Sequence, residues 1–194
     1  MLDEGRGGVN EGRGPRAREL ALAEPSHFVI LSIGSNLGDR LGNLRAGLAR
    51  VEDGGSLAVE AVSSVYASDP IEAAGGEFLN VAVAARTALE PASLLAALKA
   101  AEQAAGRTGS TTDPRPLDLD ILYFDDLVSA LGQLRIPHPR RLDRPFVLVP
   151  LAEVCGDARD PETGGLVADE VAPRLAGALR SVRRVAGPEW WKGR

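Results

Sequence analysis

The sequence has few of the residues that several classes of protein need, and each scarcity excludes one class. Cys155 is the one cysteine among 194 residues, so an internal disulfide framework is excluded and a reducing compartment is favoured. No apolar run approaches the ~20 residues that span a bilayer, and the first residues are charged rather than signal-like. We therefore expect a cytoplasmic protein with no membrane partner.

Positive charge and aromatic side chains are also scarce. The formal net charge is −5, and aromatic residues make up 4% of the chain. A nucleic-acid-binding protein attracts phosphates with a basic field, and an RNA-binding sheet stacks bases on exposed aromatic side chains. We therefore expect no nucleic-acid partner.

The chain is long enough for one full hydrophobic core and too short for two. Residues 1–26 are rich in Gly, Arg and Glu without a hydrophobic period, and we interpret them as a disordered extension or an artefact of the start site. Residues 27–185 should form a single domain. Residues 186–194 should form a tail, whose two adjacent tryptophans either dock on the domain or fray.

Hydrophobic periodicity predicts the order of the elements. Apolar alternation predicts strands at residues 28–33, 59–66, 80–87 and 117–124. A helix capped by Asp39 follows the first strand, and another runs from Pro91 to near Gly106. The β-α-β-β-α-β order predicts an α+β fold, the ferredoxin-like sandwich, with both helices on one face of an antiparallel sheet. Residues 125–173 should add short helices and a final hairpin.

Two aspartates lie two residues apart in Asp118-Leu119-Asp120, where a loop leads into the last predicted strand. Successive side chains on a strand point to opposite faces, so the two carboxylates should converge while Leu119 faces the other way. Like charges held close repel unless a cation lies between them, and Mg²⁺ bound by carboxylates, water and substrate phosphates is the usual solution. Arg115 adds a planar set of donors suited to phosphate oxygens. The alternative is a solvated strand edge without a ligand.

Several short motifs occur in the order found in one known family. They are Ile33-Gly-Ser-Asn-Leu-Gly38, Val62-Ser-Ser-Val-Tyr66, Phe78-Leu-Asn-Val-Ala-Val83, Glu102 with Gly106-Arg107, Pro114-Arg-Pro-Leu-Asp-Leu-Asp-Ile121, Ile136-Pro-His138, Arg144-Pro-Phe146 and Leu148-Val-Pro-Leu151. Together they lie within residues 28–155. Over this range the chain resembles the 6-hydroxymethyl-7,8-dihydropterin pyrophosphokinase family of the folate pathway.

The resemblance implies transfer of a pyrophosphoryl group from ATP to the 6-hydroxymethyl group of a reduced pterin, with release of AMP. Asp118 and Asp120 would hold two Mg²⁺ ions that bridge the triphosphate, and would act in catalysis together with Arg107 and Arg115. The implied ATP contacts are Arg107, Arg115, Ile121, His138 and Arg144. The implied pterin contacts are Ser68, Ile71, Phe78, Asn80 and Phe146. The two phenylalanines would stack on the ring while the asparagine reads its edge.

Each implied role has a structural alternative. Arg107 could complement the dipole of a helix C-terminus, and His138 could be a loop residue with a backbone partner. Arg144 could form a surface ion pair with Asp143. The two phenylalanines could be ordinary core residues.

Two features depart from the family pattern. The connector Thr108–Asp113 carries neither the basic residues nor the tryptophan usual there, so we expect a mobile tether rather than a lid that clamps ATP. Lys99 stands where a glutamine near the adenine is expected. Rival interpretations are a different Mg²⁺-dependent phosphotransferase, a non-catalytic ligand-binding module on the same fold, and an RNA-binding ferredoxin-like domain. We expect a monomer whose partners are its small-molecule substrates.

Overall fold

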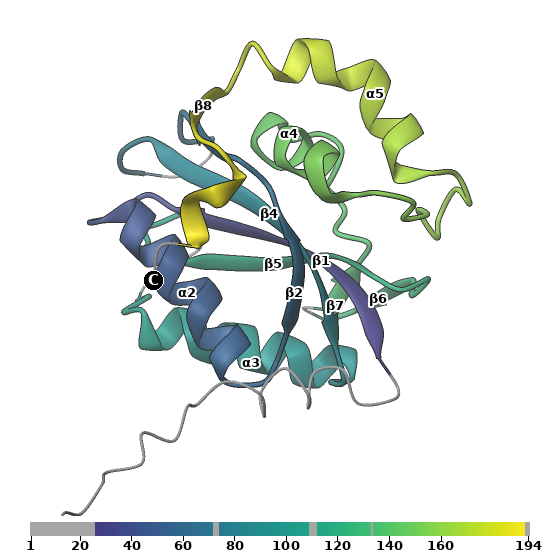
Figure 1. The fold of residues 1–194 in the computed structure, drawn as a ribbon, viewed down its shortest axis with the longest axis horizontal. Helices are drawn as coiled ribbons and strands as arrows, with labels where there is room; N and C mark the ends of the chain where they lie inside the picture. The colour runs from purple at the N-terminus through teal and green to yellow at the C-terminus, as the bar shows by residue number, and fades with distance from the viewer. Residues whose placement is uncertain (1–25, 72–73, 109–111, 133, 193–194) are drawn as a thin grey trace, which may run out of the picture.

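The computed structural model describes residues 26–71, 74–108, 112–132 and 134–192 (Figure 1). Two expectations fall outside these ranges: the disorder of residues 1–25 in the N-terminal extension, and the mobility of residues 109–111 in the connector. None of the helices in the described ranges is both long enough and apolar enough to cross a membrane.

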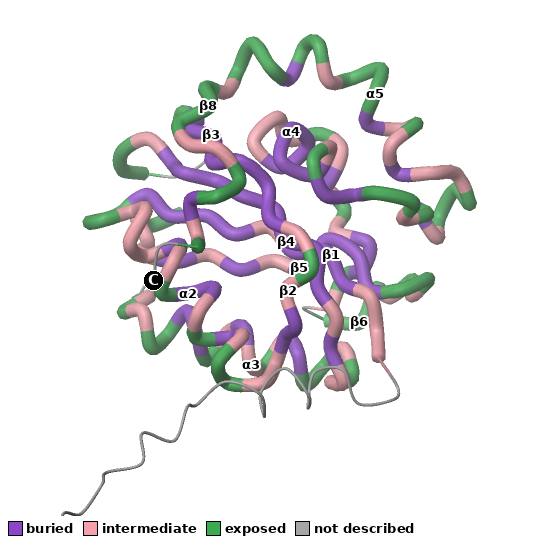
Figure 2. Tube along the Cα trace, in the orientation of Figure 1, coloured by how far each residue is buried: buried purple, intermediate pink, exposed green. Residues whose placement is uncertain are grey.

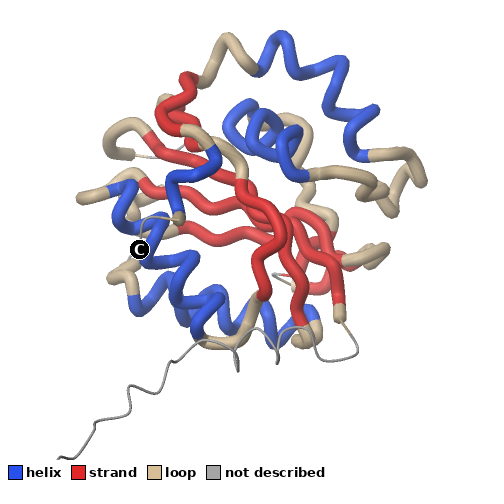
Figure 3. Tube along the Cα trace, viewed as in Figure 1, coloured by secondary structure: helices blue, strands red, loops and turns tan. Residues whose placement is uncertain are grey.

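A six-stranded sheet lies between two layers of helices (Figures 1 and 3). The strand order is β5-β1-β4-β3-β8, β2 also pairs with β4, and all of these pairs are antiparallel. The strands are β1 (His27–Ser35), β2 (Ala58–Val62), β3 (Val65–Ser68), β4 (Phe78–Thr87), β5 (Asp118–Phe124) and β8 (Arg183–Ala186). A separate hairpin consists of β6 (Ser129–Leu131) and β7 (Leu134–Ile136).

The helices divide between the two faces of the sheet. Helices α2 (Arg40–Asp53) and α3 (Pro91–Ala104) pack on one face. Helix α4 (Pro145–Val154) covers the other face, and α5 (Val167–Ala178) packs beside α4. A short 3-10 helix (Pro188–Trp191) follows β8. This arrangement confirms the predicted α+β fold, the ferredoxin-like sandwich.

Strand alternation explains why the core has two layers. Leu31 and Ile33 of β1 point toward α2 and α3, where they join the core that contains Leu48 and Leu98. Ile30, the residue before Leu31, points toward α4 instead. All of these side chains are fully buried, and the strands form the buried centre of the molecule in Figure 2. Because each such side chain stabilises the fold by ~1.5–3 kcal/mol when buried, the pattern of β1 determines which face each helix covers.

The predicted helix ends agree with the structure. The carboxylate of Asp39 accepts a hydrogen bond from the N–H of Gly42 at 3.0 Å, which is the expected N-cap arrangement. Helix α2 ends at the Gly54 cap. Helix α3 begins with Pro91 and ends just before Gly106.

The single strand predicted at residues 59–66 is two strands, because the ladder with β4 is interrupted at Ser63. The N–H of Ser63 donates to the carbonyl of Ala82 at 2.9 Å, and its hydroxyl accepts from the N–H of Ala82 at 2.9 Å. The N–H of Ser64 donates to the side chain of Glu153 in α4 at 2.8 Å. Serine side chains can satisfy a backbone in this way without disturbing the apolar alternation, so the sequence pattern conceals the break.

The expected hairpin and short helices follow β5, but the hairpin comes before the helices. The hairpin β6–β7 follows β5 directly, and the chain returns to the sheet as a single strand, β8, which pairs with β3. The expected division at residue 185 falls inside β8. Beyond it, Trp190 is buried in the core between the sheet and helices α2 and α3. Its Nε1–H donates to the carbonyl of Ser63 at 3.0 Å. The partner of β8 is the open edge of β3, which no local pattern of residues 183–186 indicates.

Tyr66 gives the fold a testable pH dependence. Its hydroxyl donates to the carboxylate of Glu153, and burial together with this carboxylate raises the pKa of Tyr66 to about 12 from its usual 10.0. Since the pKa is higher in the folded state, the bound proton stabilises the fold below pH 10.0, and that contribution is lost as the pH rises toward about 12. Urea titrations should therefore show a steeper fall in the free energy of unfolding above about pH 10 for the native protein than for Tyr66→Phe. Parallel curves for the two proteins would contradict this account.

Candidate active site

A cavity of about 710 Å³ opens on the α4 side of the sheet, where β1, β4 and β5 present polar side chains. Ligand sites commonly have volumes of roughly 300–1,000 Å³. The floor consists of the strand residues that alternate away from α2 and α3. These residues are Ser32, Gly34, Phe78, Asn80, Asp118 and Asp120.

Gly34 lies at the centre of this floor. It pairs with Asn80 of β4 on one side and with Asp118 of β5 on the other. A Cβ atom at Gly34 would lie 3.4 Å from Oδ1 of Asn80, 3.6 Å from the ring of Phe78 and 3.9 Å from Cβ of Asp118. The glycine therefore keeps the floor open between the carboxylates and the asparagine.

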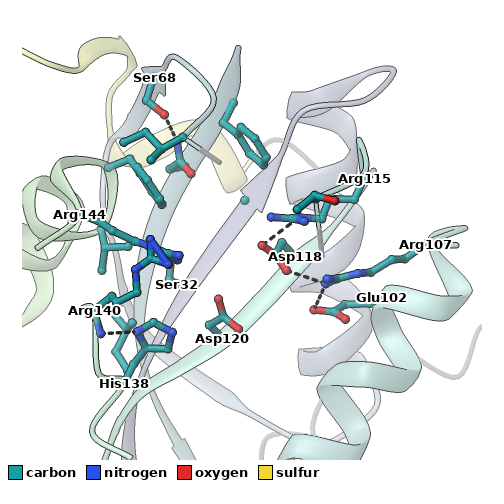
Figure 4. A pocket seen from close by; sticks show the side chains of 18 of the residues that line it. Ser32, Ser68, Glu102, Arg107, Arg115, Asp118, Asp120, His138, Arg140 and Arg144 are labelled. Atoms are coloured by element: carbon teal, nitrogen blue, oxygen red, sulfur yellow. Dashed lines mark hydrogen bonds and ion pairs between the residues drawn. The ribbon is translucent and has the colours of Figure 1, made fainter. Parts of the chain in front are cut away.

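Asp118 is held by two arginines, one at each carboxylate oxygen (Figure 4). Nη1 of Arg107 lies 2.5 Å from Oδ1, and Nε of Arg115 lies 3.0 Å from Oδ2. Leu117 and Leu119 are fully buried on the opposite face, which confirms the alternation predicted for this strand. The two arginines implied to bind phosphate thus lie beside the first of the two aspartates.

Asp120 follows on the same face, in an environment that opposes its charge. Burial raises the pKa of Asp120, and repulsion from Asp118 raises it further, while nearby cationic side chains act in the opposite direction. A hard cation beside the two carboxylates would remove this penalty. No group of three or more His, Cys, Asp or Glu side chains that could enclose a metal ion occurs in the described ranges. The oxygen donors of the aspartate pair fit an ion such as Mg²⁺, which completes its coordination with water and phosphate.

Glu102 of α3 organises this half of the cavity, a role not predicted from the sequence. Its side chain is 3% exposed, and Oε1 accepts a hydrogen bond from the N–H of Leu119 at 2.7 Å. The same oxygen lies 2.9 Å from Nη1 of Arg107 and 2.8 Å from Nζ of Lys99. Because β5 is an edge strand, the N–H of Leu119 lacks a neighbouring strand, and Glu102 takes its place. The signal in the sequence is a carboxylate on an apolar helix stripe, four residues after Leu98.

Lys99, the departure from the family pattern, is part of the same arrangement. Its Nζ donates to the carbonyl of Leu119 at 3.3 Å. The backbone between the two aspartates is therefore held at its N–H by Glu102 and at its carbonyl by Lys99. This fixes the direction in which both aspartate side chains leave the strand.

Asn36 holds Arg115 through the backbone. Oδ1 of Asn36 accepts from the N–H of Arg115 at 2.7 Å, and the N–H of Asn36 donates to the carbonyl of Arg115 at 3.1 Å. Nδ2 of Asn36 donates to the carbonyl of Ala74 at 3.0 Å. The turn after β1 therefore joins the loop that carries Arg115 to the loop between β3 and β4.

The loop between β7 and α4, residues 137–144, supplies the opposite side of the cavity (Figure 4). Its cavity-lining side chains are His138, Arg140 and Arg144, of which Arg140 was not predicted. Nδ1 of His138 accepts from the N–H of Arg140 at 3.1 Å, so the neutral ring carries its proton on Nε2. Burial lowers the pKa of His138, which favours this neutral ring. The Nε2–H group can then donate to a phosphate oxygen.

All five residues implied for the pterin line the same cavity. They are Ser68, Ile71, Phe78, Asn80 and Phe146. Asn80 is 3% exposed, and its Nδ2 donates to the hydroxyl of Ser68 at 3.1 Å and to the carbonyl of Tyr66 at 3.4 Å. These bonds use both amide hydrogens, so the carbonyl oxygen is the atom that Asn80 offers to a ligand.

The two aromatic walls each have an arginine beside them. The guanidinium carbon of Arg115 lies 5.5 Å from the ring centre of Phe78, and that of Arg144 lies 5.6 Å from the ring centre of Phe146. Arg115 therefore contacts both Phe78 and Asp118, so it links the aromatic half of the cavity to the carboxylate half.

Ile121 is the implied ATP contact that the structure does not bring to the cavity. Its side chain is 6% exposed and lies in the core beneath α2 and α3. The alternation that directs Asp118 and Asp120 into the cavity directs Ile121 away from it. The side chain of Ile121 therefore has a packing role.

Residues 30–156 match the family model of 7,8-dihydro-6-hydroxymethylpterin-pyrophosphokinase (HPPK). The chain belongs to this family. It is 40% identical over 132 residues to the 2-amino-4-hydroxy-6-hydroxymethyldihydropteridine pyrophosphokinase of Bacillus subtilis. That alignment covers 67% of this chain and 79% of the Bacillus subtilis protein. It is also 40% identical over 146 residues to a mitochondrial folate synthesis bifunctional protein of Arabidopsis thaliana, which covers 74% of this chain but 26% of that protein.

Solved HPPK-DHPS structures share the fold. The wild-type Plasmodium falciparum HPPK-DHPS structure with SDX-DHP has a TM-score of 0.64 and 14% sequence identity, over 86% of this chain and 49% of that one. The HPPK-family chain thus spans 26% of the Arabidopsis thaliana relative, 49% of the Plasmodium falciparum chain with the same fold, and most of the Bacillus subtilis protein.

Glu102 gives a prediction for this part of the site. Glu102→Gln keeps an acceptor for the N–H of Leu119 but removes the charge that holds Arg107 and Lys99, and a hydrogen bond to a charged group contributes ~1.5–3 kcal/mol. We expect turnover, measured where circular dichroism shows the variant to be fully folded, to fall roughly 10-fold or more. Glu60→Gln, which removes an exposed ion pair with Arg86, is the control and should keep full turnover. Equal turnover in the two variants would show that Glu102 does not organise the site.

Proposed function

We propose that this HPPK-family chain transfers the pyrophosphoryl group of ATP to 6-hydroxymethyl-7,8-dihydropterin, giving the pterin diphosphate and AMP in folate biosynthesis. Family membership supports the substrates and the reaction. The observation that carries the proposal is that one cavity holds a carboxylate pair, a basic rim and an aromatic slot with a buried asparagine. The alcohol oxygen of the pterin attacks the β-phosphorus and gives up its proton to water. The bond from this phosphorus to the oxygen shared with the α-phosphate breaks, and AMP leaves with that oxygen.

The triphosphate would lie against the basic rim. The cationic side chains that line the cavity come from α3, from the segment before β5 and from the loop before α4; they are Lys99, Arg107, Arg115, Arg140 and Arg144. Arg107 and Arg115 are already oriented by their ion pairs, so they can stabilise charge that develops on the phosphates without first reorganising. The neutral ring of His138 adds an Nε2–H donor on the opposite side.

Asp118 and Asp120 would hold two Mg²⁺ ions, and their oxygen donors and their mutual repulsion fit that ion. Bound there, the ions would supply positive charge to the triphosphate. The carboxylates themselves fix the position of this charge, because Glu102 and Lys99 hold the backbone between them.

The pterin would occupy the slot between Phe78 and Phe146, with the oxygen of Asn80 accepting a hydrogen bond from the ring edge. Ser68 keeps this amide in the required orientation. Because Arg115 contacts Phe78 and Asp118 together, it lies where the two substrates meet. Such placement lowers the entropic cost of bringing the alcohol to the β-phosphorus.

We also propose that the chain acts as a monomer, because one chain by itself forms a cavity that contains the residues assigned to both substrates. Light scattering during size-exclusion chromatography should give a mass close to the 20.3 kDa of one chain. A dimer that dissociates together with loss of activity would contradict this proposal.

The carboxylate pair gives the direct test of the reaction. With Mg-ATP and the hydroxymethyl pterin, the native protein should release AMP, whereas ADP would indicate a different phosphotransferase and no turnover a ligand-binding module. Asp118→Asn and Asp120→Asn should each lower AMP release roughly 100-fold or more, the usual cost of removing a main electrostatic group. Asp126→Asn, on the exposed turn after β5, is the control and should release AMP at the native rate. Native-like release by either cavity variant at saturating Mg²⁺ would refute the assignment.

Asn80 gives the test of pterin recognition. Removing a buried group that pairs with a ligand costs ~1–3 kcal/mol, so Asn80→Ala should weaken pterin binding by roughly 5- to 150-fold. The affinity for a non-hydrolysable ATP analogue, measured by calorimetry on the same samples, should stay within about 2-fold, because Asn80 lies in the aromatic half of the cavity. The reverse pattern would place the pterin elsewhere.

A further inference from the structure

A buried ion pair outside the cavity joins the loop 137–144 to the segment that follows α4. Asp160 is fully buried, and its Oδ2 lies 2.8 Å from Nε and 2.5 Å from Nη2 of Arg141, whose side chain is 8% exposed. Glu162 adds a second carboxylate, 2.7 Å from the same Nη2. None of these three residues lines the cavity. Asp160 and Glu162 come after residues 30–156, the segment that matches the family model.

Arg141 is connected to the cavity through the backbone of its own loop. Its Nη1 donates to the carbonyl of His138 at 3.3 Å, and its N–H donates to the same carbonyl at 3.0 Å. The N–H of Arg140 donates to the ring of His138 at 3.1 Å. The orientation of the His138 ring therefore depends on a short turn. Arg141 stabilises this turn through two hydrogen bonds to the His138 carbonyl, one from its backbone N–H and one from its side chain.

Asp160 is itself fixed in place. Its N–H donates to the carbonyl of Gly165 at 2.9 Å, and its Oδ1 accepts from the N–H of Glu162 at 2.9 Å. The hydroxyl of Tyr123 donates to Oδ2 at 2.9 Å. Since Tyr123 is in β5, three residues after Asp120, the same carboxylate is tied to the loop of His138 and to the strand of the aspartates.

We propose that Asp160 is a positioning residue for the ATP side of the cavity, acting through Arg141 on His138 and Arg140. Two buried charges lose most of their mutual attraction to desolvation, so a well-packed apolar pair would stabilise the fold about as well. An apolar pair could not direct the rigid set of donors of Arg141 to both Asp160 and the His138 carbonyl. The proposal rests on the proposed function only in that this loop binds ATP.

The decisive experiment separates positioning from stability. Asp160→Asn should lower the urea midpoint and weaken binding of a non-hydrolysable ATP analogue by roughly 10-fold, with pterin binding unchanged. The double variant Arg141→Met with Asp160→Leu should recover the midpoint but not the affinity for the analogue. If the double variant recovers both, Asp160 has a structural role alone and the proposal is overturned. The control is Glu153→Gln, which loses a carboxylate that bonds Ser64 and Tyr66, and it should change stability but not analogue binding.

A milder variant keeps the test valid if the buried substitutions prevent folding. Glu162 is 49% exposed at its side chain, so Glu162→Gln should fold and should weaken analogue binding by roughly 2- to 5-fold. The chain has two histidines, so the imidazole nitrogen signals of His138 can be assigned by comparison with His27→Asn. These signals should shift in Glu162→Gln, and unchanged signals with unchanged affinity would overturn the proposal. A native protein that binds the analogue but releases no AMP would refute the proposed reaction, not this positioning role.

Discussion

The constraint on which the rest of the site depends is the closeness of two like charges on one face of one strand. Asp118 and Asp120 converge because β5 alternates, and burial together with their repulsion raises the pKa of Asp120. Keeping both groups anionic requires positive charge that stays in place. The surrounding helices and loops can be understood as the means by which the fold supplies that charge.

The hydrogen-bond donors of the rim come from segments far apart in the sequence, and three of these segments are held by side chains from other parts of the chain. Glu102 holds Arg107, the side chain of Asn36 holds the backbone of Arg115, and Asp160 holds the loop of His138 through Arg141. A rim fixed in this way is preorganised for phosphate groups, because its donors are already in position before a ligand binds. This is why the buried carboxylates of Glu102 and Asp160 are as important as the donor groups that line the cavity.

The parts of the fold that depend on a local repeat could be predicted from the sequence. β1, α2 and α3 each bury one face, so their periods are visible, and the same alternation predicted that Asp118 and Asp120 share a face. Other features depend on distant partners. Trp190 forms a hydrogen bond with a residue 127 positions away, and residues 183–186 form strand β8 because they pair with the open edge of β3. The alternation also predicted the face of the Ile121 side chain, which lies in the core beneath α2 and α3.

The most direct test of the central claim is to count the metal ions that the aspartate pair holds. Titration of Mn²⁺ followed by electron paramagnetic resonance, with a non-hydrolysable ATP analogue present, should give two bound ions per native chain. Asp118→Asn and Asp120→Asn should each bind fewer ions or bind them more weakly by roughly 10-fold or more, since each removes an anionic ligand. If both variants bind two ions as tightly as the native chain, the aspartates are not the metal site and the account of the cavity is wrong.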